Sequence, residues 1–151
     1  MLYRFEQDER LDPEKIEVVV RSAEKSAEVG ALLAYLKSFQ TDRPEVLPVR
    51  DIDRIVLVEV SQLILIEVDG DYLILSTKTG QLPTRSRLYQ LAERLNNPDF
   101  IQISKYALVN IKWVKHLENS FSGNMTAFLK NGQQATVSRR YLKGLSTYLG
   151  L

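Results

Sequence analysis

The strongest constraint on the fold is a succession of short, β-rich runs that are separated by turn signals from residue 52 onward. Asp69-Gly70 and Asn131-Gly132 each join two such runs, and Asp-Gly or Asn-Gly favours a tight hairpin because glycine accepts a positive φ. The apolar run 63–68 is too short to cross a membrane and is followed by a charged turn, so it is predicted to be a buried strand. Together these patterns predict a mostly-β (β-rich α+β) fold, with about ten short strands in small sheets.

The sequence from residue 52 onward predicts both strands and two helices. The strands are expected at residues 52–60, 63–68, 72–76, 82–85, 100–104, 107–113 with an extension over 116–118, 125–129 and 134–137. The helices are expected at residues 87–95 and 139–148, because leucines recur there at a spacing of three and four. Ser86 and Ser138 are predicted to cap them.

The first 44 residues are predicted to form a separate β-β-α extension. Its expected elements are strands at residues 2–6 and 16–20 and a helix at residues 27–39 that is capped by Ser26. The polar, proline-containing segment 40–48 reads as a linker with a boundary near residues 41–46. The predicted domains are therefore 1–44 and 45–151.

Composition argues against several kinds of chemistry. The chain has no cysteine and one histidine, His116, so disulfides and thiolate zinc sites are excluded. Nucleotide-binding and calcium-loop motifs and a nucleophile elbow are absent from the sequence. We therefore expect no enzymatic activity, no cofactor and no metal site. The acidic N-terminus lacks the apolar core of a signal peptide, which favours a cytoplasmic location.

The net charge of +1 conceals an asymmetry. Residues 1–44 and 45–95 each carry a balance of −2, whereas residues 96–151 contain seven Lys/Arg and two Asp/Glu, a balance of +5. A local basic excess favours a polyanion such as DNA, because phosphate neutralisation is a local effect. The alternative is that these lysines and arginines merely solvate one face.

Three cations in this region stand in positions that suit an anionic partner. Lys105 interrupts a strand pattern, where its side chain can project from a turn. Arg139 and Arg140 fall in the first turn of the predicted last helix, where the helix dipole disfavours each positive charge by about 0.3–1 kcal/mol. A bound phosphate or a guanine edge would remove that conflict.

Simpler explanations stay open for these residues. Arg140 could stack on Tyr141 or pair with Asp99 or Glu118. Asn110 ends a strand-like run, and an asparagine there is more often a structural hydrogen-bonding group than a base-reading one.

Residues 46–151 resemble the LytTR DNA-binding domain family. The segments that carry the resemblance are IEVDGDYL (66–73), TRSRLYQLAERL (84–95), FIQISKYALVNIKWV (100–114), LKNG (129–132) and VSRRY (137–141). The resemblance implies about ten strands in small sheets. It also implies loops that reach successive major grooves, and transcriptional regulation in the bacterial cytoplasm. Standalone family members carry a short N-terminal extension where others have a receiver domain.

The resemblance also implies positions that face DNA. They fall on Asp71, Ser104, Lys105 with its neighbour Tyr106, and Arg139 with its neighbour Arg140, while Asn110 matches a structural position. Two positions depart from the family pattern, since Asp71 is acidic and Tyr106 replaces a small serine. Tyr106 is therefore expected either to contact a sugar or methyl group or to pack within the protein.

The expected function is that of a sequence-specific transcriptional regulator that contacts the major grooves of double-stranded DNA through loops. A homodimer is expected, because DNA readers often bind repeated half-sites. The alternative is a protein- or ligand-binding regulatory module that does not bind DNA. A membrane-protein partner is suggested by family analogy alone.

Overall fold

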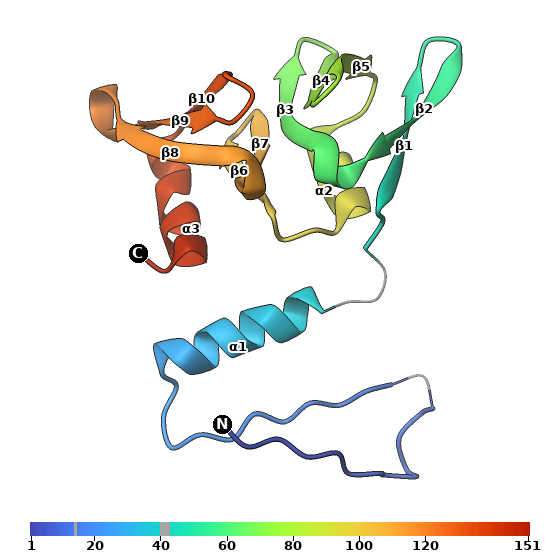
Figure 1. The fold of residues 1–151 in the computed structure, drawn as a ribbon, viewed down its shortest axis with the longest axis vertical. Coiled ribbons are helices and arrows are strands. Elements are labelled where there is room, and N and C mark those ends of the chain that lie inside the picture. Colours follow the sequence, from blue (N-terminus) through green and yellow to red (C-terminus); the bar gives the residue numbers. More distant parts are fainter. Residues whose placement is uncertain (14, 40–42) are drawn as a thin grey trace. The chain divides into compact units, whose positions relative to one another are not determined.

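The computed structural model describes residues 1–13, 15–39 and 43–151, which fall into two compact units, 1–39 and 40–151 (Figure 1). Each unit is described by itself. The predicted linker over residues 40–48 lies partly outside the described residues, because 40–42 are not among them.

The larger unit confirms the mostly-β prediction. Its described residues form ten strands in three sheets, and every pairing is antiparallel. The two-stranded sheet consists of β1 (Val46–Asp51) and β2 (Arg54–Glu59). The five-stranded sheet has the order β5 (Gly80–Thr84), β4 (Tyr72–Thr77), β3 (Leu63–Asp69), β7 (Ala107–Asn110) and β6 (Phe100–Ser104). The three-stranded sheet has the order β10 (Gln134–Val137), β9 (Met125–Leu129) and β8 (Val114–Asn119).

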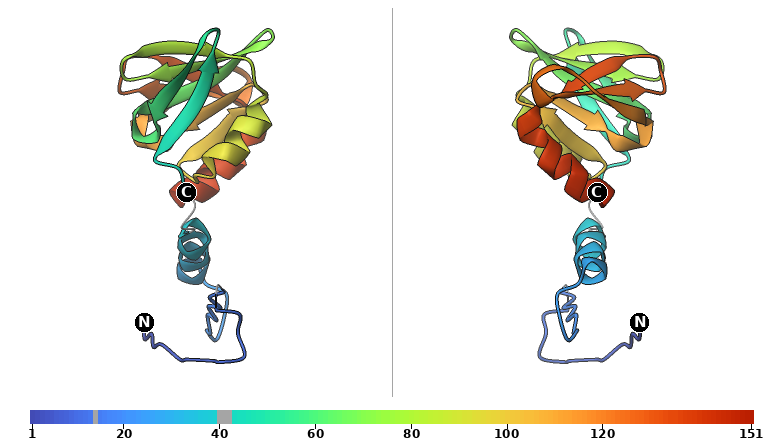
Figure 2. Two further views of the ribbon diagram at one scale, coloured as in Figure 1. Left: turned by 90° about the vertical axis from the view of Figure 1, so that its right-hand side faces the viewer. Right: turned by 90° about the vertical axis from the view of Figure 1, so that its left-hand side faces the viewer.

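Two helices complete this unit, α2 (Leu88–Leu95) and α3 (Arg139–Leu149). Short 3-10 turns occupy Val60–Gln62, Ile111–Trp113 and Phe121–Gly123. Figure 2 shows the β1–β2 hairpin on one side of the unit, and the three-stranded sheet with α3 on the other.

Strand β3 lies at the centre of the core, as its continuous apolar sequence predicts. Ile66 belongs to a cluster formed with β1, β2, β4 and α2, whereas Leu65 belongs to a second cluster formed with β6, β7, β9, β10 and α3. Both side chains are almost fully buried. The five-stranded sheet is therefore covered on both faces, so strand β3 carries apolar side chains on each.

Both predicted hairpin turns are present. Gly70 (φ 59°) connects β3 to β4, and Gly132 (φ 89°) lies between β9 and β10. These left-handed conformations are the ones that glycine adopts without a steric penalty.

The cap predictions for the two C-terminal helices are wrong in detail. Helix α2 begins at Leu88 rather than after Ser86, and the Arg87 N–H donates to Oε1 of Gln90 at 3.4 Å. Ser138 occupies the cap position of α3, but its hydroxyl makes no capping bond. Asn124 supplies that bond from another segment, because its Oδ1 accepts the Arg139 N–H at 3.0 Å.

The strand predicted over residues 107–113 is also shorter than expected. Strand β7 ends at Asn110, whose Oδ1 accepts the Lys112 N–H at 3.0 Å and so stabilises a 3-10 turn. This side-chain bond replaces a ladder bond and redirects the chain into β8.

The smaller unit contains helix α1 (Ala27–Ser38), and Ser26 caps it as predicted by accepting the Val29 N–H at 3.3 Å. The strands predicted at residues 2–6 and 16–20 are wrong for this structure, since the described residues before α1 contain no strand. An isolated two-stranded hairpin is at best marginally stable in water. The apolar side chains of these segments lack the covering layer that a sheet needs.

Candidate nucleic-acid interface

The first predicted contact lies on the β3–β4 turn. Register pairs Asp69 with Tyr72, which leaves Gly70 and Asp71 as the two turn residues. Asp71 is exposed. The backbone of Gly70 therefore fixes the turn, and Asp71 is presented to solvent beside it.

The second predicted contact lies on the β6–β7 turn. A register shift between Gln102 and Ser104 ends the regular pairing, and the Ser104 hydroxyl then accepts the Tyr106 N–H at 3.1 Å. Lys105 and Tyr106 are both exposed, and the Lys105 ammonium lies 5.5 Å from the centroid of the Tyr106 ring. This distance suits a cation–π contact. The tyrosine thus supports the lysine and does not pack into the core.

The third predicted contact lies at the start of helix α3. Arg139 and Arg140 are both exposed. A β-carbon on Gly123 would lie 2.9 Å from Cδ of Arg139, so the stem of this arginine runs directly over the loop backbone. No ion pair among the described residues involves Arg140. The acidic partners suggested for it are otherwise engaged, since Asp99 accepts from Tyr148 and Glu118 pairs with His116.

Backbone hydrogen bonds join the three loops. The Val68 N–H donates to the Tyr106 carbonyl at 2.9 Å, which fastens the β6–β7 turn to β3 close to the β3–β4 turn. The Ser138 N–H donates to the Ile103 carbonyl at 2.8 Å, which fastens the start of α3 to strand β6. The β6–β7 turn is therefore the centre of the candidate site, and each of the other two predicted loops is hydrogen-bonded to one side of it.

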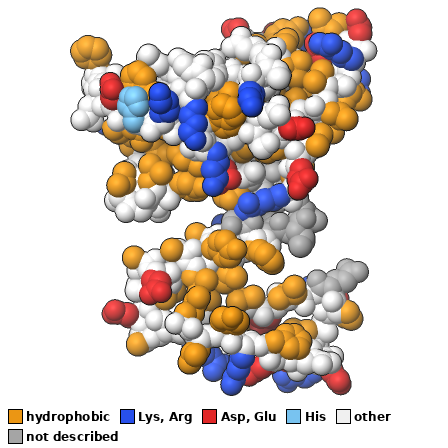
Figure 3. All heavy atoms as spheres, viewed as in Figure 1, with side chains coloured by type: hydrophobic (Ala, Val, Ile, Leu, Met, Phe, Trp, Pro, Cys, Tyr) orange, Lys and Arg blue, Asp and Glu red, His pale blue; other side chains and the backbone are white. Residues whose placement is uncertain are grey.

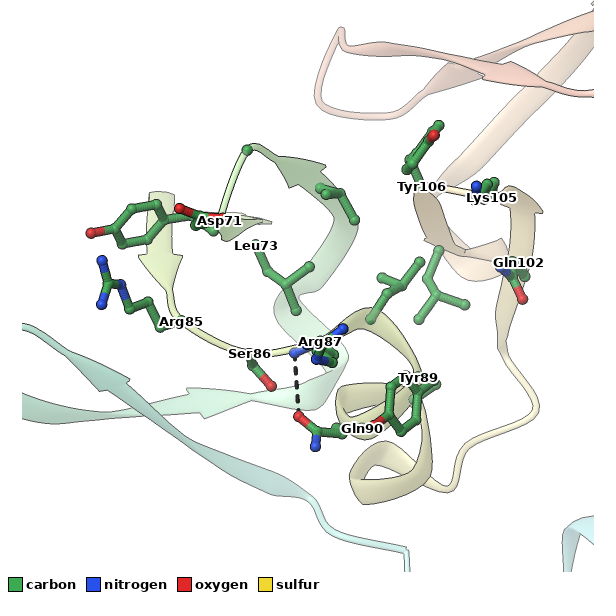
Figure 4. A pocket seen from close by; sticks show the side chains of 16 residues that line it. Asp71, Leu73, Arg85, Ser86, Arg87, Tyr89, Gln90, Gln102, Lys105 and Tyr106 are labelled. Carbon is green, nitrogen blue, oxygen red and sulfur yellow. Dashed lines mark hydrogen bonds between the residues drawn. The ribbon is translucent and has the colours of Figure 1, made fainter.

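Asp71, Lys105 and Tyr106 line a common groove of about 740 Å³ (Figure 4). Its floor includes the apolar side chains of Leu73 and Leu108. Arg139 and Arg140 are not among the lining residues. The structure thus groups Asp71, Lys105 and Tyr106 in one concavity, and Ser104 and the two arginines of α3 do not line it.

Sequence reasoning missed two further cations of this groove, Arg85 and Arg87. They lie between β5 and α2 and, with Lys105, give the groove three positive charges against the one negative charge of Asp71. The Arg85 guanidinium lies over the Tyr72 ring, 5.4 Å from its centroid. The available signal was the segment TRSR (84–87), in which two arginines fall in a short connection before a helix.

Asn110 is positioned for a structural task. It is 3% exposed, and its Nδ2 donates to the Leu63 carbonyl at 2.9 Å while its Oδ1 accepts from Lys112. Both ends of the amide are therefore occupied within the core, as buried polar groups require.

The basic excess of residues 96–151 extends beyond the three loops. Figure 3 shows Lys and Arg side chains along β8 on the visible face, where the sequence supplies Lys115 and the 3-10 turn before it supplies Lys112. Within the described ranges, no cluster of three His, Asp or Glu side chains could hold a metal ion. In the same part of the chain, no helix has the length and apolarity needed to cross a membrane.

Comparison with known proteins agrees with this architecture. The family model of the LytTr DNA-binding domain matches residues 53–150. A solved LytTr DNA-binding domain from Bacillus cereus superposes with a TM-score of 0.64 at 20% identity, covering 72% of this chain and 99% of that one. At this identity the superposition supports the fold alone.

Three curated relatives are regulatory proteins by name. The sensory transduction protein LytR of Streptococcus agalactiae is 27% identical over 97 residues, which cover 64% of this chain and 39% of that protein. The sensory transduction protein LytT of Enterococcus faecalis is 25% identical over 140 residues, which cover 93% and 57%. The transcriptional regulatory protein LytR of Staphylococcus aureus is 24% identical over 129 residues, which cover 85% and 52%. The chain thus spans between about two fifths and three fifths of these relatives' lengths. Since the family model covers residues 53–150 and the fold agrees, the chain belongs to the LytTr DNA-binding domain family.

Proposed function

We propose that this protein is a sequence-specific DNA-binding transcriptional regulator that contacts double-stranded DNA through three loops. The observation that carries the proposal is the set of backbone hydrogen bonds that joins the three loops. The β6–β7 turn with Lys105 lies in the middle, the β3–β4 turn with Asp71 is bonded to one side of it, and the start of α3 with Arg139 is bonded to the other. Loops on a rigid scaffold commonly carry recognition residues. The basic excess of residues 96–151 supplies the attraction for phosphates.

Each exposed cation receives a role in this proposal. Arg139 reads a base edge, since a guanidinium can bond guanine bidentately. Lys105 contacts a base or a phosphate, while Arg140, Arg85 and Arg87 neutralise backbone phosphates. Ser104 shapes its turn through the bond to the Tyr106 N–H, and Tyr106 offers its exposed ring to a sugar or a thymine methyl group. In this role the protein needs neither cofactor nor metal, catalyses no reaction and acts in the cytoplasm as a homodimer.

The experiment selects bound oligonucleotides from a random pool and then titrates the selected duplex with variants. Arg139→Ala should lose about 1–3 kcal/mol of discrimination against base changes at one position. Lys130→Ala, on the β9–β10 turn, serves as the control and should weaken binding evenly across sequences or not at all. Unchanged affinity and unchanged base preference in Arg139→Ala would reject the assignment of Arg139.

A regulatory module that binds a protein or a small ligand is the second candidate, because the groove also has an apolar floor. Salt dependence separates the two candidates. A protein that neutralises several phosphates loses affinity steeply as salt rises. Binding to the selected duplex that hardly changes with salt would favour the second candidate.

A further inference from the structure

The described residues of the smaller unit expose an unusual amount of apolar surface. Figure 3 shows hydrophobic side chains spread over the visible face of this unit. The exposed apolar residues are Met1, Leu2, Tyr3, Phe5, Leu11, Ile16, Val18, Val19, Leu33, Tyr35 and Phe39. Helix α1 has charged side chains only at Glu28 and Lys37, so it is apolar nearly all round. A helix of this composition is normally buried on most sides.

Among the described residues before α1 there is no strand that could cover this surface. A single hairpin from residues 2–6 and 16–20 would be marginal, whereas three or more strands with a packed face are stable. A second copy of the same unit would supply the missing strands.

The charge pattern of residues 16–21 favours pairing with itself. Glu17 and Arg21 lie two residues on either side of Val19. Antiparallel pairing about a two-fold axis at Val19 would place each Glu17 opposite an Arg21 of the other copy, and each Val18 opposite a Val20. The ion pairs found among the described residues include neither Glu17 nor Arg21. Opposite charges facing each other across strands are stabilising, and like charges are destabilising.

We propose that residues 16–21 pair antiparallel with residues 16–21 of a second copy, centred on Val19, and that the N-terminal unit forms its sheet only in this dimer. Segment 2–6 then adds the outer strand on each side, which gives four strands. Ile16, Val18 and Val20 share one face of this sheet, where the apolar α1 helices cover them. Glu17, Val19 and Arg21 lie on the other face.

This pairing deepens the proposed function, since it links two DNA-reading domains and thereby suits a repeated half-site. Chain association is then coupled to strand formation, as in segments that fold on binding. DNA affinity should therefore rise with protein concentration in the range where the dimer forms.

Single cysteines in the full chain test the register, because the natural sequence has none. Residues directly opposite in antiparallel strands have Cα atoms about 4.5–5.5 Å apart, within the range that a disulfide bridges. Val19→Cys should therefore form a covalent dimer under mild oxidation. In the matched control Ser22→Cys, which leaves both charged residues of the pairing in place, the two cysteines would stand about 20 Å apart along the strands and should stay unlinked. Equal cross-linking of both variants, or of neither, would overturn the register.

Charge reversal tests the partner. Glu17→Arg and Arg21→Glu should each weaken the dimer about tenfold in sedimentation equilibrium, because each creates two like-charged pairs. The double reversal Glu17→Arg/Arg21→Glu should restore it, which a general loss of folding would not do. A chain that is monomeric at every concentration, or a double variant as weak as the single ones, would overturn the proposal. Dimer formation without binding to any selected duplex would instead refute the proposed function and leave the pairing intact.

Discussion

The groove between the β3–β4 turn and helix α2 gives the most direct quantitative test of DNA binding. If Arg85 and Arg87 each neutralise one phosphate, replacing both with alanine removes two contacts. Each phosphate contact contributes about 0.9 to the slope of log affinity against log salt for B-form DNA. The double variant should therefore have a slope that is shallower by about 1.8.

Fluorescence anisotropy with the selected duplex would measure this slope. Across a fourfold rise in salt, a difference of 1.8 in slope makes the wild-type protein lose about 12-fold more affinity than the variant. Base preference should stay the same, because phosphate contacts carry no sequence information. Arg54→Ala is the matched control, since Arg54 begins strand β2 after the β1–β2 turn and does not line this groove. An unchanged slope in the double variant, with wild-type binding intact, would refute the placement of DNA along the groove.

Three further outcomes follow from single contacts. Asp71→Asn should raise the affinity for the selected duplex about two- to fivefold, because it removes the negative charge from the groove. A weaker complex in the same anisotropy assay would instead indicate that Asp71 accepts a hydrogen bond from a cytosine amino group. Asn110→Ala should lower the free energy of unfolding in urea by about 2–3 kcal/mol, because the buried Leu63 carbonyl loses the Nδ2 donor of Asn110. A folded variant that has normal stability but no DNA binding would show instead that Asn110 reads DNA. Burial, and then the hydrogen bond to Asp99, raise the pKa of Tyr148 to about 12, so this tyrosine stabilises the fold below pH 10 and loses that contribution as pH rises to 12. Because Tyr148 is 43% exposed, solvent screening limits its contribution to the free energy of unfolding to about 1 kcal/mol. Tyr148→Phe should therefore reduce the fall in melting temperature between pH 9 and pH 12. An equally steep fall in the wild-type protein and the variant would contradict this reasoning.

Much of the larger unit was predictable because its signals are local. The Asp-Gly and Asn-Gly turns and the apolar run of β3 depend on neighbouring residues, and each appears where the sequence indicates it. The caps of α2 and α3 were not predictable in the same way. Asn124 caps α3 from a position 15 residues earlier in the chain, and such a partner becomes visible only when the fold brings the segments together.

The candidate site shows the same division. Lys105 and Arg139 interrupt local patterns, so the sequence alone singles them out. Arg85 and Arg87 interrupt no pattern, because a polar connection before a helix is ordinary. Their relevance depends on the pairing of β3 with β7, which brings the connection before α2 and the β6–β7 turn to one groove. The strands predicted in residues 2–6 and 16–20 failed for a related reason, since alternation indicates a strand but does not provide the layer that it packs against.

If the loops read DNA as proposed, the hydrogen bonds that fix them explain how their side chains are presented with precision. The β6–β7 turn is held by its own serine hydroxyl, by the Val68 N–H and, through Ile103, by the Ser138 N–H. Two of these bonds join backbone to backbone, so they do not depend on which side chains the turn carries. Substitutions at Lys105 or Arg139 should therefore change the preferred base without moving the loops. Changing Asn124, which no DNA contact requires, should reduce affinity by releasing the first turn of α3.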